Sequence, residues 1–323
     1  MSAGTFTPSH PPVTHQIPLQ DLPIVQRPRY GRLLAVVVVG ILLAQFVVGA
    51  ITNPRFDWPT FGAFFFSTTV LKALWLTVQL TVYGAVLGFA GGVVLAVMRQ
   101  SPNPLLRATS WSFIWLFRSI PLLVQILFWG FLGALYTHLG YGIPFGPVFG
   151  EAATKDLIGP MSAAVIGLSI HQAAYGAEII RAGLLSVDEG QREAAAALGI
   201  PARKQFTRIV FPQAMRTIVP PATNEIIGLL KGTSAVFIIA LPDLFYQVQV
   251  IYGRNGRIIP LLMVAVVWYV ILTGLLSVVQ FYVERYFAKG AHRELPPTPI
   301  QRLRVRWNHR RPLRTSPTRA SQV

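Results

Sequence analysis

The chain has 323 residues, of which 53% are hydrophobic and only 12% are charged, whereas a soluble domain carries about 25% charged residues. This composition excludes an ordinary soluble protein and indicates an integral membrane protein. The net charge of +16 is concentrated in tails and loops, so it indicates membrane topology rather than a nucleic-acid partner. The absence of cysteine excludes disulfides, thiolate metal sites and cysteine nucleophiles.

The N-terminal part of the chain contains a polar segment and then an apolar one. Residues 1–32 are rich in proline and predict a disordered cytoplasmic tail. Residues 33–51 are apolar and about long enough to cross a bilayer, so they predict an N-terminal transmembrane helix. Residues 52–73 are expected to form a loop whose aromatic side chains pack at the outer membrane interface.

Five further apolar segments predict five more transmembrane helices. The second span carries glycines that permit close helix packing, and Pro121 interrupts the third. A Gly/Pro-rich loop is expected at 135–160, and a basic cytoplasmic tail at 284–323. The predicted fold is an all-α integral membrane protein with six transmembrane helices. The five further spans are predicted at 74–98, 109–134, 161–181, 218–241 and 258–282.

A polar segment between the fourth and fifth spans, residues 186–212, predicts two short helices joined by a tight bend. Ser186 and Glu189 have the spacing of a capping box, and Asp188 is a second N-cap candidate. Gly199 fits the position just after a helix end, where a left-handed backbone is common. Pro201 fits the first turn of the next helix. Pro212 is expected to end the unit.

The distribution of basic residues predicts which side of the membrane this helix pair faces. With both termini inside, 21 Lys and Arg residues fall in inner segments and 5 in outer segments. Inner loops are enriched in Lys and Arg, so both termini and the helix pair are expected in the cytoplasm.

Several polar residues lie in or near the apolar spans, where a charge is costly unless it faces protein, water or a partner. In one interpretation they form a path near the membrane midplane that suits a zwitterionic solute. In the other they are structural: Arg118 or Lys231 pairs with Glu178 or Glu225, and His171 is a hydrogen-bonded packing residue. The candidates for the path are Arg118, Pro121, Gln125, His171, Gln172, Glu178, Lys231, Thr233 and Ser234.

The sequence contains no phosphate-binding loop of the form GxxxxGK[ST] and no nucleophile constellation. No His/Asp/Glu cluster has metal-ligand spacing. We therefore expect a chain that is not an enzyme, holds no cofactor or metal, and leaves any ATP hydrolysis to another subunit.

The helix pair resembles the EAA signature of ABC-importer permeases, which couples the permease to its ATPase. In that pattern, Glu-Ala-Ala is followed after three residues by Gly, then after nine by Ile, then by one residue and Leu-Pro. Phe211 stands here where the pattern has Leu. By this resemblance the ATPase-coupling residues are Gly190, Gln191, Glu193, Ala194, Ala195, Gly199, Ile209 and Pro212.

Four blocks, all within residues 74–283, resemble the polar amino acid branch of these permeases. They are WLTVQLTVYGAVLGFAGGVVLAVMR, FRSIPLLVQ, AAYGAEIIRAG and LLKGTSAV. Ser119 and Ile120 depart from the branch's Gly-Thr, and Gly232 departs from its Asp. If that Asp pairs with the Lys in the branch, Lys231 lacks its local partner here.

The resemblance implies a type I importer core of five helices, with the N-terminal helix as an addition, in the cytoplasmic membrane. It also implies a second permease copy or paralogue, a cytoplasmic ABC ATPase dimer and an extracytoplasmic solute-binding protein. The implied function is import of a polar amino acid by alternating access.

Three alternatives remain open on the residues alone. One is a self-contained secondary transporter or channel for a small zwitterionic solute, although no inverted repeat is visible. Another is a membrane anchor or receptor component that functions through its basic C-terminal run, RLRVRWNHRRPLR, whose charge suits anionic lipid or nucleic acid. The third is an amphipathic helix pair with no partner.

Overall fold

The computed structural model describes residues 30–143 and 146–287, and it divides between Phe56 and Asp57 into two compact units. The predicted tails, 1–32 and 284–323, lie almost entirely outside the described residues. The N-terminal unit contains helix α1, Tyr30–Thr52, and a 3₁₀ turn, Pro54–Phe56. Helix α1 has 23 residues and a mean hydropathy of 2.8, as expected for a membrane span.

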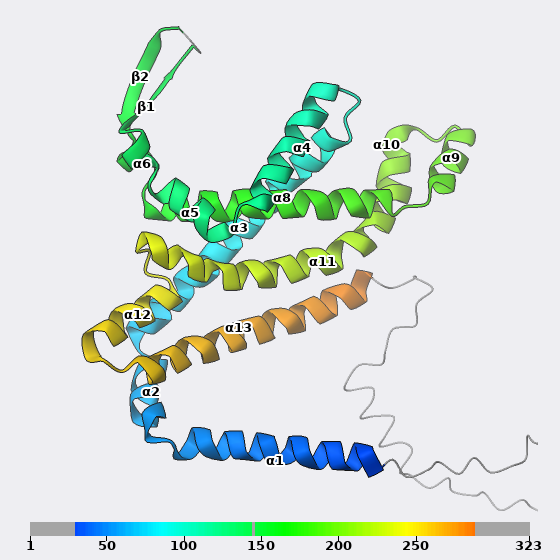
Figure 1. The fold of residues 1–323 in the computed structure, drawn as a ribbon. Helices are drawn as coiled ribbons and strands as arrows, with labels where there is room; N and C mark the ends of the chain where they lie inside the picture. The colour runs from blue at the N-terminus through cyan, green and yellow to red at the C-terminus, as the bar shows by residue number, and fades with distance from the viewer. Residues whose placement is uncertain (1–29, 144–145, 288–323) are drawn as a thin grey trace, which may run out of the picture. The chain divides into compact units, whose positions relative to one another are not determined.

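The main unit is almost entirely helical, and its long helices correspond to the predicted spans (Figure 1). Among the described residues of the whole chain, five helices are long and apolar enough to cross a membrane, and a sixth span is formed if the bent pair α4–α5 counts as one. The long helices of the main unit are α3 (Thr68–Arg99), α8 (Pro160–Leu185), α11 (Phe211–Gly232) and α13 (Ile258–Phe287), and the bent pair is α4 (Pro104–Ser119) with α5 (Leu122–Gly130). The shorter elements are α2 (Trp58–Phe65), α6 (Leu132–Leu135), β1 (His138–Gly142), β2 (Val148–Ala153), α7 (Thr154–Leu157), α9 (Glu189–Ala197), α10 (Ala202–Gln205) and α12 (Leu244–Asn255).

Helices α3 and α8 pack closely because glycines recur every four residues along one face of α3. A Cβ on Gly88 would lie 2.4 Å from the Cβ of Gln172, and one on Gly92 would lie 3.0 Å from the backbone nitrogen of Ala177. Small residues at this spacing let two helix backbones approach one another. The close packing predicted from the glycines of the second span is therefore confirmed.

This contact provides a test of the packing. Gly88→Val is expected to lower the melting temperature in detergent, because overpacking a tight contact costs about 1–3 kcal/mol. Gly228→Val is the matched control, since a Cβ on Gly228 meets nothing within 4 Å. Equal melting temperatures for the two variants would contradict the packing described here.

The third span is broken, as Pro121 predicted, and the chain bends by 102° between its two halves. Ile120 has an extended backbone, with φ −91° and ψ 127°. A residue that precedes proline is disfavoured in the helical region, so α4 ends there and α5 begins after Pro121. The hydrophobic core around this break joins α3, α5, α8 and α11 through side chains that include Leu80, Ile126, Leu168 and Leu229.

Two predicted loops contain regular structure. Within 52–73, Asp57 is the N-cap of α2 through its carboxylate, and Phe65 stacks on Trp268 of α13 with ring centroids 4.8 Å apart. Within 135–160, β1 and β2 form an antiparallel hairpin in which His138 is paired with Ala153. The Gly/Pro content that predicted a loop reflects the hairpin's turn, and residues 144–145 there lie outside the described residues.

Helix α12 was not predicted, because it is short and lies between two spans. Asp243, which is fully buried, caps it by accepting a hydrogen bond from the Tyr246 amide at 2.9 Å. Leu244 N donates to Thr77 Oγ1 of α3 at 3.0 Å, and the Tyr269 hydroxyl of α13 lies 3.4 Å from Asp243 Oδ2. The start of α12 is thus fixed against two spanning helices.

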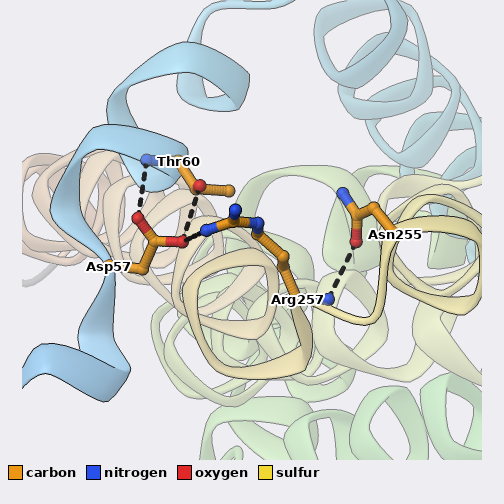
Figure 2. Close-up of polar contacts among 4 residues, drawn as sticks. All are labelled: Asp57, Thr60, Asn255 and Arg257. Carbon is orange, nitrogen blue, oxygen red and sulfur yellow. Dashed lines mark hydrogen bonds and ion pairs between the residues drawn. The ribbon is translucent and has the colours of Figure 1, made fainter.

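A second polar contact joins the start of α2 to the residues just before α13 (Figure 2). Asp57 accepts hydrogen bonds from the Thr60 hydroxyl at 2.7 Å and from the Thr60 amide, and it forms an ion pair with Arg257. The Arg257 backbone amide is held by Asn255 Oδ1 at 2.9 Å. The hydrogen bond from the Thr60 hydroxyl, and then the Arg257 guanidinium, hold the pKa of Asp57 below its usual value of 3.8.

The lowered pKa of Asp57 predicts a pH dependence of stability. A group with a depressed folded pKa stabilises the fold above its unfolded pKa, near 3.8, and this contribution is lost as the pH falls through the folded value. Asp57→Asn should therefore melt at a lower temperature than the wild type at neutral pH, and the difference should disappear in strong acid. Asp156→Asn, at an exposed residue of α7, is the control. A difference that persists unchanged below the folded pKa would contradict the assignment.

Candidate functional site

The polar segment after α8 forms a helix pair at one end of the main unit (Figure 1). Asp188 is the N-cap of α9, and its Oδ1 accepts a hydrogen bond from the Gly190 amide at 2.8 Å. The capping box predicted for Ser186 and Glu189 is not formed. Ser186 instead closes α8, where its hydroxyl donates to the Gly183 carbonyl at 2.8 Å.

Gly199 makes the bend between α9 and α10, as its position predicted. Its φ is +66°, and the amides of Gly199 and Ile200 donate to the carbonyls of Ala196 and Ala195 at 2.9 and 3.1 Å. This is the Schellman arrangement, in which a left-handed residue satisfies the last carbonyls of a helix. Pro201 lies at the N-cap of α10, one position before the predicted first turn.

The second helix of the pair does not end at Pro212. Helix α10 continues through a π-helical turn, Phe206–Val210, into α11, and the segment Ala202–Ile239 is long and apolar enough to cross a membrane. Pro212 is the second residue of α11, directly after the π-helical turn, and the helix continues through it. The pair is thus one short helix, α9, followed by an extension of α11.

The outer face of the pair is largely exposed. Ala195 is 2% exposed and packs inward, whereas Gly190, Gln191, Glu193, Ala194 and Gly199 are exposed. Of the other predicted coupling residues, Ile209 is half-buried and Pro212 is exposed. Leu198, next to the bend, is 77% exposed and was not among the predicted coupling residues.

The base of the pair is held between α8 and α11. Val187, Val210, Ala214 and Ile218 form a buried cluster there. The Ser186 hydroxyl also lies 3.0 Å from the hydroxyl of Thr217 on α11. The base of the pair is therefore in contact with both long helices.

A second candidate site is a charged cavity of about 350 Å³ between the end of α3, α4 and the second half of α8. The Arg118 guanidinium lies over the Tyr175 ring, 5.1 Å from its centroid. Glu178 is paired with Arg181, whose Nε donates to Glu178 Oε2 at 3.1 Å. The structural pairing considered for Glu178, with Arg118 or Lys231, is thus replaced by one with its neighbour on the same helix. The cavity is lined by Arg99, Trp111, Ile114, Trp115, Arg118, Ser119, Tyr175, Glu178 and Arg181.

Gln125 and His171 do not line the cavity, and their contacts support the broken span. Gln125 Nε2 donates to the carbonyls of Phe117 and Ile120 at 2.8 and 2.9 Å, and so satisfies groups near the break at Pro121. His171 Nδ1 lies 3.3 Å from the same amide nitrogen. The His171 ring also packs on Tyr175, with centroids 4.7 Å apart, so the chain of contacts leads from the break to Arg118.

The remaining residues of the predicted path do not line this cavity. Gln172 is 1% exposed and packs against Gly88. The hydroxyls of Thr233 and Ser234 donate to the carbonyls of Leu230 and Lys231, each at 2.7 Å. Both hydroxyls therefore bond backbone groups of the preceding helical turn. Hydroxyl side chains commonly bond backbone carbonyls one turn earlier.

The sequence interpretation missed most of the cavity's lining. Tyr175 and Arg181 were in a quoted block but were not assigned to the path. His171, Tyr175 and Glu178 recur at helical spacing, which would have indicated that they share one face of α8. Trp111, Trp115 and Arg118 recur at the same spacing on α4, whereas Arg99 had no such signal, because it comes from α3.

Comparisons with known proteins agree with this architecture. Residues 88–293 match the family model described as "binding-protein-dependent transport system inner membrane component". The arginine transport system permease protein ArgU of Corynebacterium glutamicum is 40% identical over 286 residues, covering 85% of this chain and 87% of ArgU. The glutamate/aspartate import permease protein GltK of Escherichia coli is 33% identical, covering 67% of this chain and 92% of GltK.

Among solved structures, the chain is similar to one described as an amino acid ABC transporter with histidines. The sequence identity is 30%, the TM-score is 0.57, and the match covers 68% of this chain and 94% of that one. The EAA signature on α9 and α10 belongs to the same family. The chain is therefore a multi-pass protein of the cytoplasmic membrane and belongs to the family of inner membrane components of binding-protein-dependent transport systems, the permease subunits of ABC importers.

Proposed function

We propose that this chain is the permease subunit of an ATP-driven importer that moves a polar amino acid into the cytoplasm. The observation that carries the proposal is the exposed α9–α10 bend, held at its base between α8 and α11. A surface of this kind receives a partner's motion and transmits it to two helices. The relatives named above, permeases for arginine and for glutamate/aspartate, support an amino acid as the solute.

The proposed orientation follows the basic residues, with both termini and the α9–α10 pair in the cytoplasm. An ABC ATPase dimer binds ATP there and presses on the pair, so this chain needs no cofactor of its own. A second permease subunit, a copy or a paralogue, completes the translocation path. An extracytoplasmic solute-binding protein delivers the amino acid, and the two permeases alternate between outward-open and inward-open states.

The charged cavity is the proposed place where the solute is held. Arg118 presents a guanidinium to the cavity and suits the α-carboxylate of an amino acid, because such pairs form charge-assisted hydrogen bonds. Glu178, which is paired with Arg181, supplies the opposite sign for the α-ammonium group, and the Tyr175 ring packs against the Arg118 guanidinium. A pocket with both signs of charge discriminates a zwitterion from a neutral solute of similar size.

Reconstitution in proteoliposomes tests this proposal. The permease is combined with its partner ATPase and solute-binding protein, and uptake of labelled arginine, glutamate and glutamine is measured. The proposal expects uptake of at least one of them that requires ATP on the ATPase side and the binding protein on the other. Uptake that needs neither, and that collapses when the proton gradient is removed, would contradict it and support a secondary transporter.

A further inference from the structure

Arg192 lies on α9 within the coupling segment, but no role was assigned to it from the sequence. Its Nη2 donates a hydrogen bond to the backbone carbonyl of Leu184, near the end of α8, at 2.7 Å. Its Nε is buried and has no partner among the described residues. Arg192 as a whole is half-buried, and the hydrogen bond to Leu184 holds its guanidinium in place at the end of α8.

The carbonyl that Arg192 reaches is one that α8 cannot satisfy itself. The last four carbonyls of a helix have no partner within it. Ser186 satisfies two of those near the end of α8: its amide donates to Ala182 at 3.0 Å and its hydroxyl donates to Gly183 at 2.8 Å. Arg192 satisfies the next, Leu184. A cation at this position is also favoured by the negative end of the helix dipole.

Few other contacts are available to fix α9. Ala195 is the only buried residue of α9, whose described residues are complete, and alanine contributes little apolar area. The connection from α8 is short, residues 186–188, and Asp188 uses its carboxylate to cap α9 rather than to hold α8. Gln191 and Glu193, on either side of Arg192, are exposed. Arg192 is thus the side chain of α9 that points back to the membrane-spanning helix.

We infer that Arg192 is a positioning residue that fastens α9 to the C-terminal end of α8, so that a push on α9 moves α8 as one body. The inference rests on the proposed function and deepens it by naming the route of the coupling. Leu184 lies one helical turn after Arg181, which lines the charged cavity with Glu178. The contact therefore connects the coupling surface to the helix that carries the proposed solute site.

Spin labels test the contact without any partner protein. The chain has no cysteine, so labels at Leu185→Cys on α8 and Ala196→Cys on α9 are unambiguous. The distance distribution between them should be narrow in the wild-type background and should broaden in Arg192→Met. Arg203→Met is the matched control, because Arg203 is exposed and its side chain makes no hydrogen bond among the described residues. Unchanged widths in Arg192→Met would overturn the inference.

Coupling is then measured in the reconstituted complex as solute molecules imported per ATP hydrolysed. Arg192→Met should retain the ATPase and hydrolyse ATP at nearly the wild-type rate, but import per ATP should fall at least roughly fivefold, because a hydrogen bond to a charged group is lost. Arg192→Lys should recover part of the import per ATP, since an ammonium group also donates to a carbonyl. Unchanged import per ATP, or loss of the ATPase itself, would overturn the inference. If the wild-type complex hydrolyses ATP without import, the proposed function fails, and the label distances still decide the Arg192 contact.

Discussion

Gly199→Val is expected to reduce solute uptake by at least roughly tenfold while the protein still inserts in the membrane. Gly199 has a φ of +66°, which a β-branched residue adopts only at a cost of about 1–2 kcal/mol or more. A Cβ there meets nothing within 4 Å, so the cost lies in the backbone and not in a clash. Relief of this strain would extend α9 past the bend and move the α9–α10 surface away from its partner.

The controls for Gly199→Val separate backbone strain from coupling. Gly199→Asn should retain much of the uptake, because asparagine tolerates the left-handed region. Gly256→Val places the same strain at a φ of +71° after α12, away from the helix pair, and should spare ATPase binding. ATPase binding and uptake are measured on purified complexes and in proteoliposomes. Normal uptake by an inserted Gly199→Val variant would contradict the role of the bend.

Arg118→Gln is expected to lower the maximal rate of uptake by roughly ten- to a hundredfold. The substitution removes the guanidinium that lies over Tyr175 and faces the charged cavity. A hydrogen bond to a charged group is worth about 1.5–3 kcal/mol, which sets the expected loss. The loss should appear in the rate rather than in the affinity of the binding protein, because solute capture precedes its transfer to the permease.

Arg107→Gln is the matched control for Arg118→Gln, since Arg107 is exposed on the same helix and does not line the cavity. Arg118→Lys should recover only part of the rate, because an ammonium group keeps the charge but lacks the planar fork that binds a carboxylate with two hydrogen bonds. Both proteins should still copurify with the ATPase. Equal uptake rates for Arg118→Gln and Arg107→Gln would remove Arg118 from the proposed solute path.

The spans could be predicted from the sequence because hydropathy and chain-breaking residues act locally. Pro121 disfavours the helical region for the residue before it, and Ile120 has an extended backbone here. Gly199 similarly marks a bend by its own conformational freedom. Helices α2 and α12 were missed because each is short. Each also begins after an aspartate N-cap, Asp57 or Asp243, whose contacts with distant residues form only in the folded chain.

The site was harder to predict because it combines residues from several helices. Arg118 and Glu178 were identified as costly charges in apolar segments, and both line the cavity. Thr233 and Ser234 looked equally suitable, but their hydroxyls bond their own helix. Arg99 joins the cavity only because the turn between α3 and α4 brings the two helices together, which no local pattern indicates.

Copurification from mild detergent, followed by mass spectrometry of the proteins that accompany the chain, tests the central claim most directly. The account predicts an ABC ATPase in stoichiometric amount, and it predicts that the ATPase is lost when Glu193→Ala and Gly199→Val are combined. A well-folded permease that carries no ATPase under several detergent and nucleotide conditions would contradict the account.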